Sequence, residues 1–215
     1  MYENMIWIDK RKELEPMIET LYPMFQQWSW NGAVWLVSDT HLGDGDRPYM
    51  GYDIDEAEQI KRIKAKAHRC DTLIHLGDVG EPEYFKDIKA HKVLIMGNHD
   101  ETPLKFKQYF DEIYRGPLFI AEKIILSHEP VDLRGLETGM PIAINIHGHN
   151  HAGPVQSDAW HYNIAQNVFG YEPLNLNEWI KEGHMKKIKS VHRDTIDKAT
   201  AKKKRKARLK NERAK

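Results

Sequence analysis

Apolar residues along this chain gather in short runs, and each run stops at a small group of polar residues. The run at 93–96 is followed by a glycine, an amide, an imidazole and a carboxylate at 97–100. Four apolar residues before a glycine predict a buried strand that ends abruptly. Ligands in an open α/β sheet bind beyond the carboxyl ends of the strands, so we expect the polar groups to form a site there.

Other apolar runs repeat this pattern along the chain. They lie at 34–38, 72–76, 124–127 and 142–146, and the residues that follow include Asp39, His41, Asp78, His128, His149 and His151. Residues two apart in extended chain point to the same side. The pair Asp39 and His41 can therefore bind one ion or lie beside two neighbouring ions, and the same holds for His149 and His151. Oxygen and imidazole donors of this kind suit Zn, Mn, Fe or Ni better than Ca.

With Asn98 added, there are enough ligands for two metal ions. Two ions need a bridging group, and a carboxylate such as Asp78 can offer both of its oxygens. A pair of ions ~3.5–4 Å apart can activate water and stabilise an in-line phosphoryl displacement.

The polar groups, taken together, resemble the motifs of the calcineurin-like metallophosphoesterases, and among these the small bacterial and phage phosphoesterases. The resemblance covers roughly residues 33 to 170 and keeps the family's order. Its blocks are Asp39-Thr40-His41, Gly77-Asp78, Gly97-Asn98-His99-Asp100, His128 and Gly148-His149-Asn150-His151. The stretches 163–168 and 171–173 also resemble the family's late Asn-Val-rich strand and Tyr-x-Pro turn.

The resemblance implies an α/β fold, a four-layer α/β/β/α sandwich of two mixed sheets flanked by helices, with the metal site at the carboxyl ends of the strands. It implies two divalent transition-metal ions, Mn²⁺ first, with Fe, Zn or Ni as alternatives. One ion would be held by Asp39, His41, Asp78 and His151, and the other by Asp78, Asn98, His128 and His149.

The activity implied by this family is hydrolysis of phosphate mono- or diesters by direct attack of a metal-bridging hydroxide. His99 resembles the residue that protonates the leaving oxygen or stabilises charge in the transition state. Asp100 would orient it, as carboxylates orient imidazoles elsewhere. An additional role for Asp100, capping the next helix, is compatible with this.

Charge is distributed unevenly, although the net charge is zero. Residues 181–215 carry 15 Lys or Arg and 4 Asp or Glu, whereas residues 1–180 carry 17 and 28. A basic tail can contact nucleic-acid phosphates through charge alone, or it can be a solvated tail. The tail motivates one alternative, a metal-dependent nuclease on DNA or RNA. The other alternative is a non-catalytic scaffold, which the intact ligand set disfavours. The expected partner is a phosphate ester, such as a nucleotide, and the sequence leaves the oligomeric state open.

The domain limits follow from these patterns. We expect an N-terminal extension at 1–32, a metallophosphoesterase domain at 33–191, and a disordered or frayed helical tail at 192–215. The extension is either a helix packed on the core, or a dimer contact or a wall of the site. Without a long apolar run, a signal peptide or a possible internal disulfide, the sequence favours a cytoplasmic protein with no membrane partner. The one cysteine, Cys70, is expected to be inert and at least half buried.

Local signals predict further elements and leave some roles open. Asp53 would cap a helix with a stripe from Ile54 to Ala67, and Asn175 would cap a closing helix. Helices are expected at 81–90 and 103–110, a hairpin at 118–127, and strands at 161–165 and 167–169. In the loop 42–52, the side chains of Arg47, Tyr49 and Tyr52 either contact substrate or lie on an ordinary surface. Glu81 either supports the metal site or starts its helix. His75 is expected in the core rather than as a ligand, and His147 is left out of the ligand set, although it could face the same side as His149.

Overall fold

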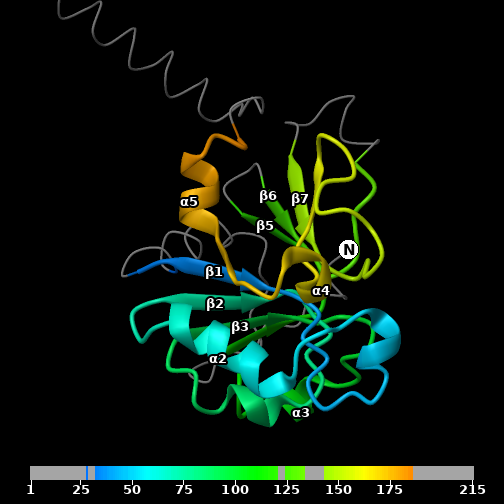
Figure 1. Ribbon diagram of the computed structural model, residues 1–215. Coiled ribbons are helices and arrows are strands. Elements are labelled where there is room, and N and C mark those ends of the chain that lie inside the picture. Colours follow the sequence, from blue (N-terminus) through cyan, green and yellow to red (C-terminus); the bar gives the residue numbers. More distant parts are fainter. Residues whose placement is uncertain (1–27, 29–31, 121–123, 134–142, 186–215) are drawn as a thin grey trace, which may run out of the picture.

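The strands form two mixed sheets in a computed structural model, which describes Trp28 and residues 32–120, 124–133 and 143–185. The first sheet has the order β4-β3-β2-β1-β9 and the second β5-β6-β7-β8 (Figure 1). The first comprises β1 (Val34–Val37), β2 (Thr72–His75), β3 (His91–Ile95), β4 (Glu112–Tyr114) and β9 (Leu174–Asn175). The second comprises β5 (Leu118–Ile120), β6 (Ile124–Leu126), β7 (Ile144–His147) and β8 (His161–Asn163). The predicted mixed α/β fold is confirmed.

Burial of the first sheet on both faces explains why its strands are runs of apolar residues rather than alternating apolar and polar residues. Val34 and Leu36 of β1 face a core shared with the second sheet, whereas Val37 faces a separate cluster with the helices. Strands β1 to β4 are parallel, and only β9 is antiparallel. Strands of a parallel sheet that is buried on both faces are nearly continuous apolar runs.

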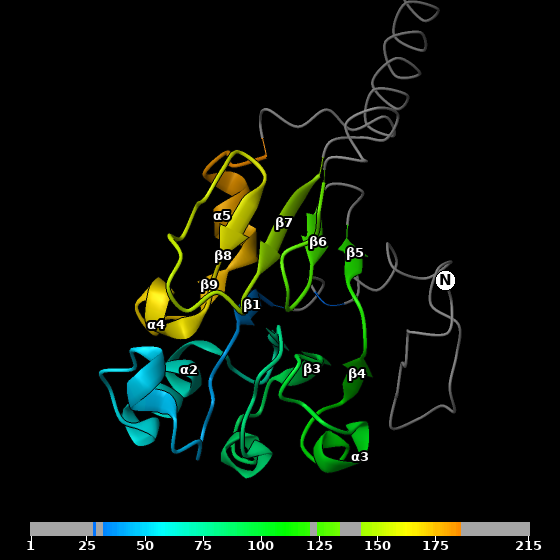
Figure 2. The ribbon, with the colours of Figure 1, turned by 90° about the vertical axis from the view of Figure 1, so that its right-hand side faces the viewer.

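Helical segments α2 (Glu56–Lys66) and α3 (Pro103–Phe106) lie on the face of the first sheet away from the second sheet (Figure 2). The short helix α5 (Leu176–Lys181) packs against β1 and β9 and sends Trp179 into the shared core. On the outer face of the second sheet, the described residues form a small apolar cluster around Ile125. The fourth layer of the sandwich therefore stays a prediction.

Two predicted elements are confirmed with their physical causes. Strands β5 and β6 pair antiparallel as the expected hairpin, whose turn lies outside the described residues. Asn175 caps α5, since its side chain accepts hydrogen bonds from the backbone N–H groups of Asn177 and Glu178. Each of these hydrogen bonds satisfies a backbone N–H group of the first helical turn that has no partner within the helix.

Other predictions of local structure were wrong. The cap of α2 is Asp55, which accepts from Glu58 N at 2.7 Å, and not Asp53. The helix expected at 81–90 is only the 3₁₀ turn η2 (Pro82–Phe85), and α3 ends at Phe106 rather than near 110.

The strand expected at 167–169 is the helix α4 (Gln166–Phe169), which ends at Gly170 in the left-handed conformation. Cys70 is exposed rather than half buried. Within the described part of the chain, every helix is too short or too polar to cross a membrane. The N-terminal helix and the tail lie outside the described residues, apart from Trp28, which is buried in the shared core.

Candidate metal centre

Parallel pairing brings the polar groups to one edge of the sheets. β1 pairs with β2 in a register that aligns Val37 with His75, and Asp39 N then donates to Gly77 O at 2.9 Å. The turns after β1, β2 and β3 thus meet those after β6 and β7, where Gly148 N donates to His128 O. The seven predicted ligands gather at this junction.

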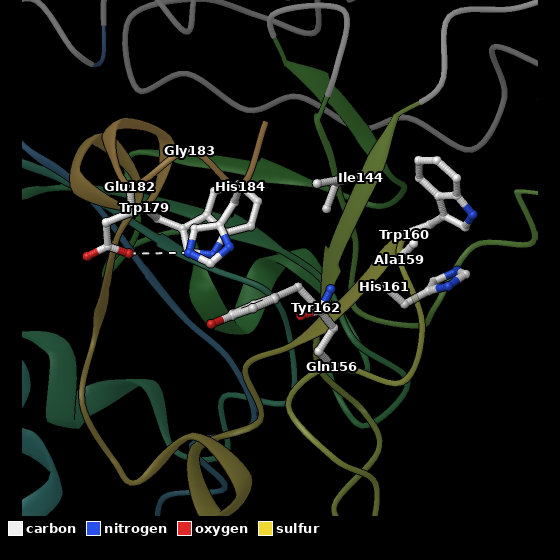
Figure 3. A pocket seen from close by; sticks show the side chains of 10 residues that line it. All are labelled: Ile144, Gln156, Ala159, Trp160, His161, Tyr162, Trp179, Glu182, Gly183 and His184. Carbon is white, nitrogen blue, oxygen red and sulfur yellow. Dashed lines mark hydrogen bonds and ion pairs between the residues drawn. The ribbon is translucent and has the colours of Figure 1, made fainter. Parts of the chain in front are cut away.

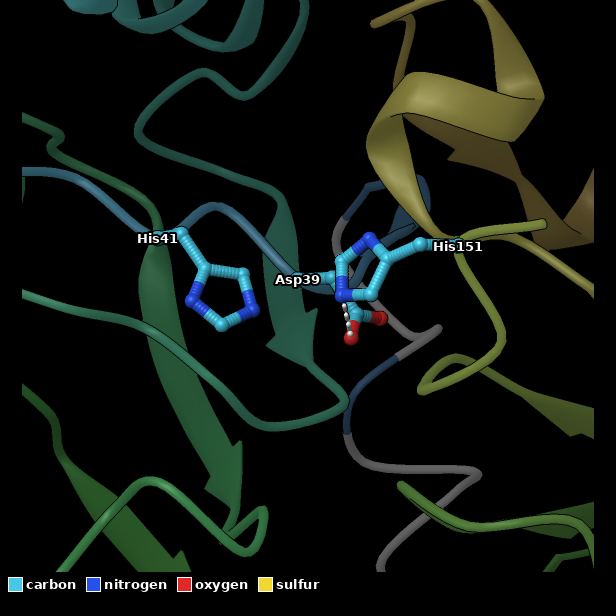
Figure 4. Close-up of side chains that lie close together, drawn as sticks. All are labelled: Asp39, His41 and His151. Carbon is cyan, nitrogen blue, oxygen red and sulfur yellow. Dashed lines mark ion pairs between the residues drawn. The ribbon is translucent and has the colours of Figure 1, made fainter. Parts of the chain in front are cut away.

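The first group consists of Asp39, His41 and His151 (Figure 4). One ligand atom from each lies within 4.8 Å of the others, and His151 Nε2 is 3.6 Å from Asp39 Oδ1. Asp39 and His41 are almost fully buried, with 0% and 1% exposure. A carboxylate with two imidazoles is a donor set that suits a divalent transition metal.

The second group consists of Asp78, His128 and His149, again with ligand atoms within 4.8 Å. Asn98 joins it, because its Oδ1 lies 2.8 Å from His128 Nε2 and 3.0 Å from His149 Nδ1. Asn98 and His149 are exposed, whereas Asp78 and His128 are buried. The second group is therefore the more open of the two.

Asp78 lies between the two groups. Its Oδ2 is 3.5 Å from His41 Nε2 in the first group and 3.3 Å from His128 Nε2 in the second. The other oxygen, Oδ1, accepts a hydrogen bond from His99 N at 2.9 Å. This is the position that a bridging carboxylate would need.

The hydrogen bonding of the histidines fits metal ligation. His41 Nε2 is buried without a hydrogen-bond partner, while its Nδ1 lies 3.1 Å from the Asp44 carboxylate. His128 Nδ1 lies 2.8 Å from Leu76 O, an acceptor that assigns a proton to Nδ1 and leaves Nε2 to face the Asp78 carboxylate at 3.3 Å. Metal-binding histidines usually fix their tautomer in this way, through a carboxylate or a carbonyl on the second nitrogen. The residues present can hold a metal in each group.

Backbone strain coincides with the candidate ligands. Asp39, His41, Asp78 and His149 have φ values of 53°, 42°, 56° and 67°, and the one other described non-glycine residue with positive φ is Tyr171. Such residues are costly outside glycine and cluster at functional sites. The strain therefore supports a functional role for these turns independently of residue type.

Two motif glycines allow the turns to approach the carboxylates. A Cβ atom on Gly97 would collide with the Asp78 side chain, and one on Gly148 would collide with Asp39 and Ser38. Neither glycine has a positive φ, so close approach rather than backbone freedom requires them.

Burial and neighbouring charges shift the pKa values of the buried candidate ligands. Burial raises the pKa of Asp39 and lowers the pKa of His41. Burial opposes the ionised form of Asp78, but the contact with His128 outweighs it and brings the pKa of Asp78 to about 2. The same contact overcomes burial at His128 and raises its pKa to about 9. Asp78 and His128 thus form an ion pair that a metal ion would replace.

His75 lies in the core beneath the site, as predicted. Its Nδ1 accepts from Gly77 N at 3.1 Å, and its Nε2 lies 2.9 Å from Thr40 Oγ1, which donates to Val79 O. The side chain therefore ties the Thr40 turn to the Gly77 turn. His147 is also buried, with Nδ1 2.8 Å from Gly148 O.

The loop after the first motif hydrogen-bonds to the turn that carries Asp39 and stabilises it, a role that the sequence did not predict. Arg47 is 5% exposed and donates to Thr40 O, Gln59 Oε1 and Ile54 O. Its guanidinium lies 4.5 Å from the centre of the Tyr52 ring, and Tyr52 Oη donates to Asp39 O. Arg47 is therefore not free to bind a substrate phosphate.

His99 and Asp100 lie in different surroundings. The imidazole of His99 is exposed, with its ring centre 5.3 Å from that of His41. The Asp100 carboxylate accepts from the backbone N–H groups of Asp78, Val79 and Gly97 at 2.9–3.0 Å. Asp100 thus holds the turns that carry the ligands together, and its described contacts do not include the His99 ring. Glu81 pairs with Lys105 at 3.1 Å on the surface.

An aromatic hollow of about 430 Å³ lies away from both groups (Figure 3). It adjoins Ile144 and His161, the first residues of β7 and β8, whereas the ligands follow the opposite ends of the strands. The His184 ring stacks on Trp179 with centroids 4.7 Å apart, which occupies one aromatic face. Glu182 Oε2 lies 3.3 Å from His184 Nε2 in the lining of the hollow, but among the described residues the groups of three side chains that could hold a metal ion are the two described above.

Several solved structures are similar to this chain, and the one with a TM-score above 0.5 supports the fold. A protein of unknown function from Aquifex aeolicus matches with a TM-score of 0.55 and 24% identity, over 69% of this chain and 98% of its own. A nuclease from Pseudomonas putida matches with a TM-score of 0.37 and 22% identity, over 68% and 73%. An archaeal phosphodiesterase matches with a TM-score of 0.39 and 19% identity, over 62% and 83%. Among curated proteins, none matches this chain.

The sequence was also compared with models of protein families. The calcineurin-like phosphoesterase superfamily domain matches residues 33–164, which is more than half of the chain. The matched segment holds all seven candidate ligands together with His99 and Asp100. On this match the chain belongs to the calcineurin-like phosphoesterase superfamily.

Proposed function

We propose that this protein is a dinuclear metal-dependent phosphoesterase that hydrolyses phosphate mono- or diesters. The position of Asp78, with Oδ2 3.5 Å from a histidine of one group and 3.3 Å from a histidine of the other, carries the proposal. A shared carboxylate is what distinguishes a two-metal site from two separate sites.

In this proposal each ion has four protein ligands besides any water, with Asp78 shared between the two ions. Asp39, His41, Asp78 and His151 would hold one ion, and Asp78, Asn98, His128 and His149 the other. Two divalent ions, with Mn²⁺ as the first candidate, would supply an activated water for in-line displacement and offset charge at phosphorus. The metal position at the carboxyl edge and the four-layer sandwich spanning 33–191 belong to the same proposal.

The chain's own groups would position the substrate and move a proton. The exposed His99 imidazole would donate a proton to the leaving oxygen, since its backbone N–H holds it beside Asp78. Asp100 would act through the backbone by clamping the Asp78 and Gly97 turns, rather than by orienting His99 directly. His99 is therefore the candidate catalytic residue, and Asp100 is a positioning residue.

Hydrolysis of two chromogenic esters tests this function. Protein loaded with Mn²⁺ should hydrolyse p-nitrophenyl phosphate, its bis-ester, or both, and the ratio separates monoesterase from diesterase activity. Asp78→Asn should abolish both activities, whereas Arg69→Ala on the opposite edge should not. Absence of metal binding after Mn²⁺, Zn²⁺, Fe²⁺ and Ni²⁺ loading would refute the proposal.

Oligonucleotides belong in the same assay. A nuclease is the alternative that the basic tail suggests, and the tail lies outside the described residues. Cleavage of DNA or RNA oligonucleotides far faster than of either chromogenic ester would favour the nuclease. Comparable rates would favour a general phosphoesterase.

A further inference from the structure

Arg115 occupies a place at the site that none of the motif blocks includes. Strand β4 is parallel to β3 in a register that pairs Tyr114 with Ile95, and Met96 N donates to Tyr114 O at 2.8 Å. Arg115 therefore leaves β4 level with Met96, beside the turn that presents Asn98. Neighbouring strands lie ~4.8 Å apart, so Arg115 starts one strand beyond the candidate ligand.

The side chain lines a pocket that opens onto the second metal group. This pocket, of about 370 Å³, is formed in part by Asn98, His128, Arg115 and Glu129, with Pro117 and Val131 as apolar walls. Arg115 is exposed, and within the described part of the chain its side chain has neither a hydrogen bond nor an ion pair. By contrast, Arg47 on the other side of the site is fully engaged by the fold.

A guanidinium that has no protein partner beside a phosphoryl-transfer site can bind a second phosphate group of the substrate. Its planar fork of donors matches phosphate oxygens in two parallel hydrogen bonds. Glu129 lines the same pocket, so the pocket is not uniformly positive and does not attract anions through bulk charge. Recognition would depend on a single directed contact.

We propose that Arg115 binds the phosphate next to the scissile one, so that the preferred substrates are nucleotide diesters with a neighbouring phosphate, such as short phosphorylated oligonucleotides. This proposal rests on the proposed function of the metal centre. The scissile phosphate would lie at the two metal groups, and the neighbouring phosphate would lie in the pocket beyond Asn98. Arg115 would thus determine specificity without taking part in the bond-breaking step.

Dinucleotides that differ by one phosphate test the contact. TpT, pTpT and TpTp would be compared as substrates of the Mn²⁺-loaded full chain. We expect wild type to cleave at least one phosphorylated form with a kcat/KM about tenfold above that of TpT, equivalent to ~1.4 kcal/mol. Arg115→Ala should lose this preference while keeping its rate on TpT and on the chromogenic bis-ester, and Arg115→Lys should retain part of it.

A matched control and a binding measurement complete the test. Arg69, another exposed arginine, precedes β2 and therefore lies at the amino ends of the parallel strands, away from the candidate ligands. Arg69→Ala should keep the preference. Thymidine 3′,5′-bisphosphate should bind wild type about tenfold more tightly than thymidine 5′-monophosphate in calorimetry, and Arg115→Ala should remove that difference. Salt should weaken the binding of the bisphosphate to wild type more than to Arg115→Ala.

The outcomes separate this proposal from the proposed function. Equal kcat/KM for TpT and both phosphorylated forms in wild type, or an unchanged preference in Arg115→Ala, would overturn the role of Arg115 and leave the phosphoesterase intact. If wild type hydrolyses no ester with any metal, the proposed function fails, and the binding of the two thymidine phosphates still decides whether Arg115 recognises a second phosphate.

Discussion

Asp78 Oδ2 lies 3.3 Å from His128 Nε2, and this contact joins the two sheets at their carboxyl edge. Asp78 follows β2 of the first sheet, and His128 follows β6 of the second. The pairing makes the junction of the sheets the place where the two groups of candidate ligands meet. Disturbing it should affect both groups at once.

Metal content is the first prediction, and it follows from the shared position of Asp78. Wild-type protein should bind about two transition-metal ions per chain. Asp78→Asn should bind less metal than either His151→Ala or His149→Ala, since each histidine belongs to one group only. Elemental analysis after loading and desalting measures the content. An Asp78→Asn protein that retains more metal than both histidine variants would show that Asp78 does not bridge.

The leaving group decides the second prediction. His99→Ala should keep the metal content of wild type, because Asn98 rather than His99 faces His128 and His149. The rate should fall by roughly 10²–10⁴ for alkyl or ribose leaving groups, the usual share of general acid catalysis. The loss should be smaller for p-nitrophenolate, which needs little protonation.

Kinetics on both substrate types, with metal counted in each sample, check this role. Equal losses on the two leaving groups would point to charge stabilisation at phosphorus instead. Loss of metal in His99→Ala would place His99 among the ligands.

His75 provides the third prediction, which concerns stability and pH. Complete burial lowers the pKa of His75 to about 3, against about 6.5 in the unfolded chain. The unfolded state therefore binds the extra proton between these values, and the stability of the native state falls as pH drops below about 6.5. This one group should cost about 2 kcal/mol between pH 7.5 and pH 5.

The variant His75→Gln isolates that contribution. Urea unfolding of the metal-free protein at pH 7.5 and pH 5 gives the loss of unfolding free energy for each protein. His75→Gln should be less stable at pH 7.5, because it disturbs the bonds to Thr40 and Gly77, but it should lose less stability on acidification. An identical pH dependence in both proteins would mean that His75 does not titrate as described.

Removal of the basic tail is the fourth prediction. Deleting residues 192–215 should leave hydrolysis of the chromogenic bis-ester unchanged, since every candidate ligand lies before residue 152 and the family match ends at 164. If the tail contacts nucleic acid, the deletion should weaken RNA or DNA binding and flatten its dependence on salt. A truncated protein that folds but no longer hydrolyses the small ester would show that the tail contributes to the site.

The sequence by itself determined the strands that precede the candidate ligands and the chemistry at their ends, whereas β4 was not predicted and the strand expected at 167–169 is a helix. Apolar runs bounded by glycine are local signals, and the residue types at 39, 41, 78, 98, 128, 149 and 151 are visible without coordinates. The core position of His75 and the cap at Asn175 were also predictable, because neighbouring residues dictate them.

Only the tertiary structure decided which groups remain available to a substrate. Arg47 is buried because the backbone carbonyls of Thr40 and Ile54, on either side of its loop, converge on its guanidinium together with the Gln59 side chain of α2. The Asp100 carboxylate is satisfied by turns from two different strands. Arg115 gained its place beside Asn98 from the register of β4 on β3. Such long-range pairings depend on how separate segments pack, and periodicity within one segment carries no information about them.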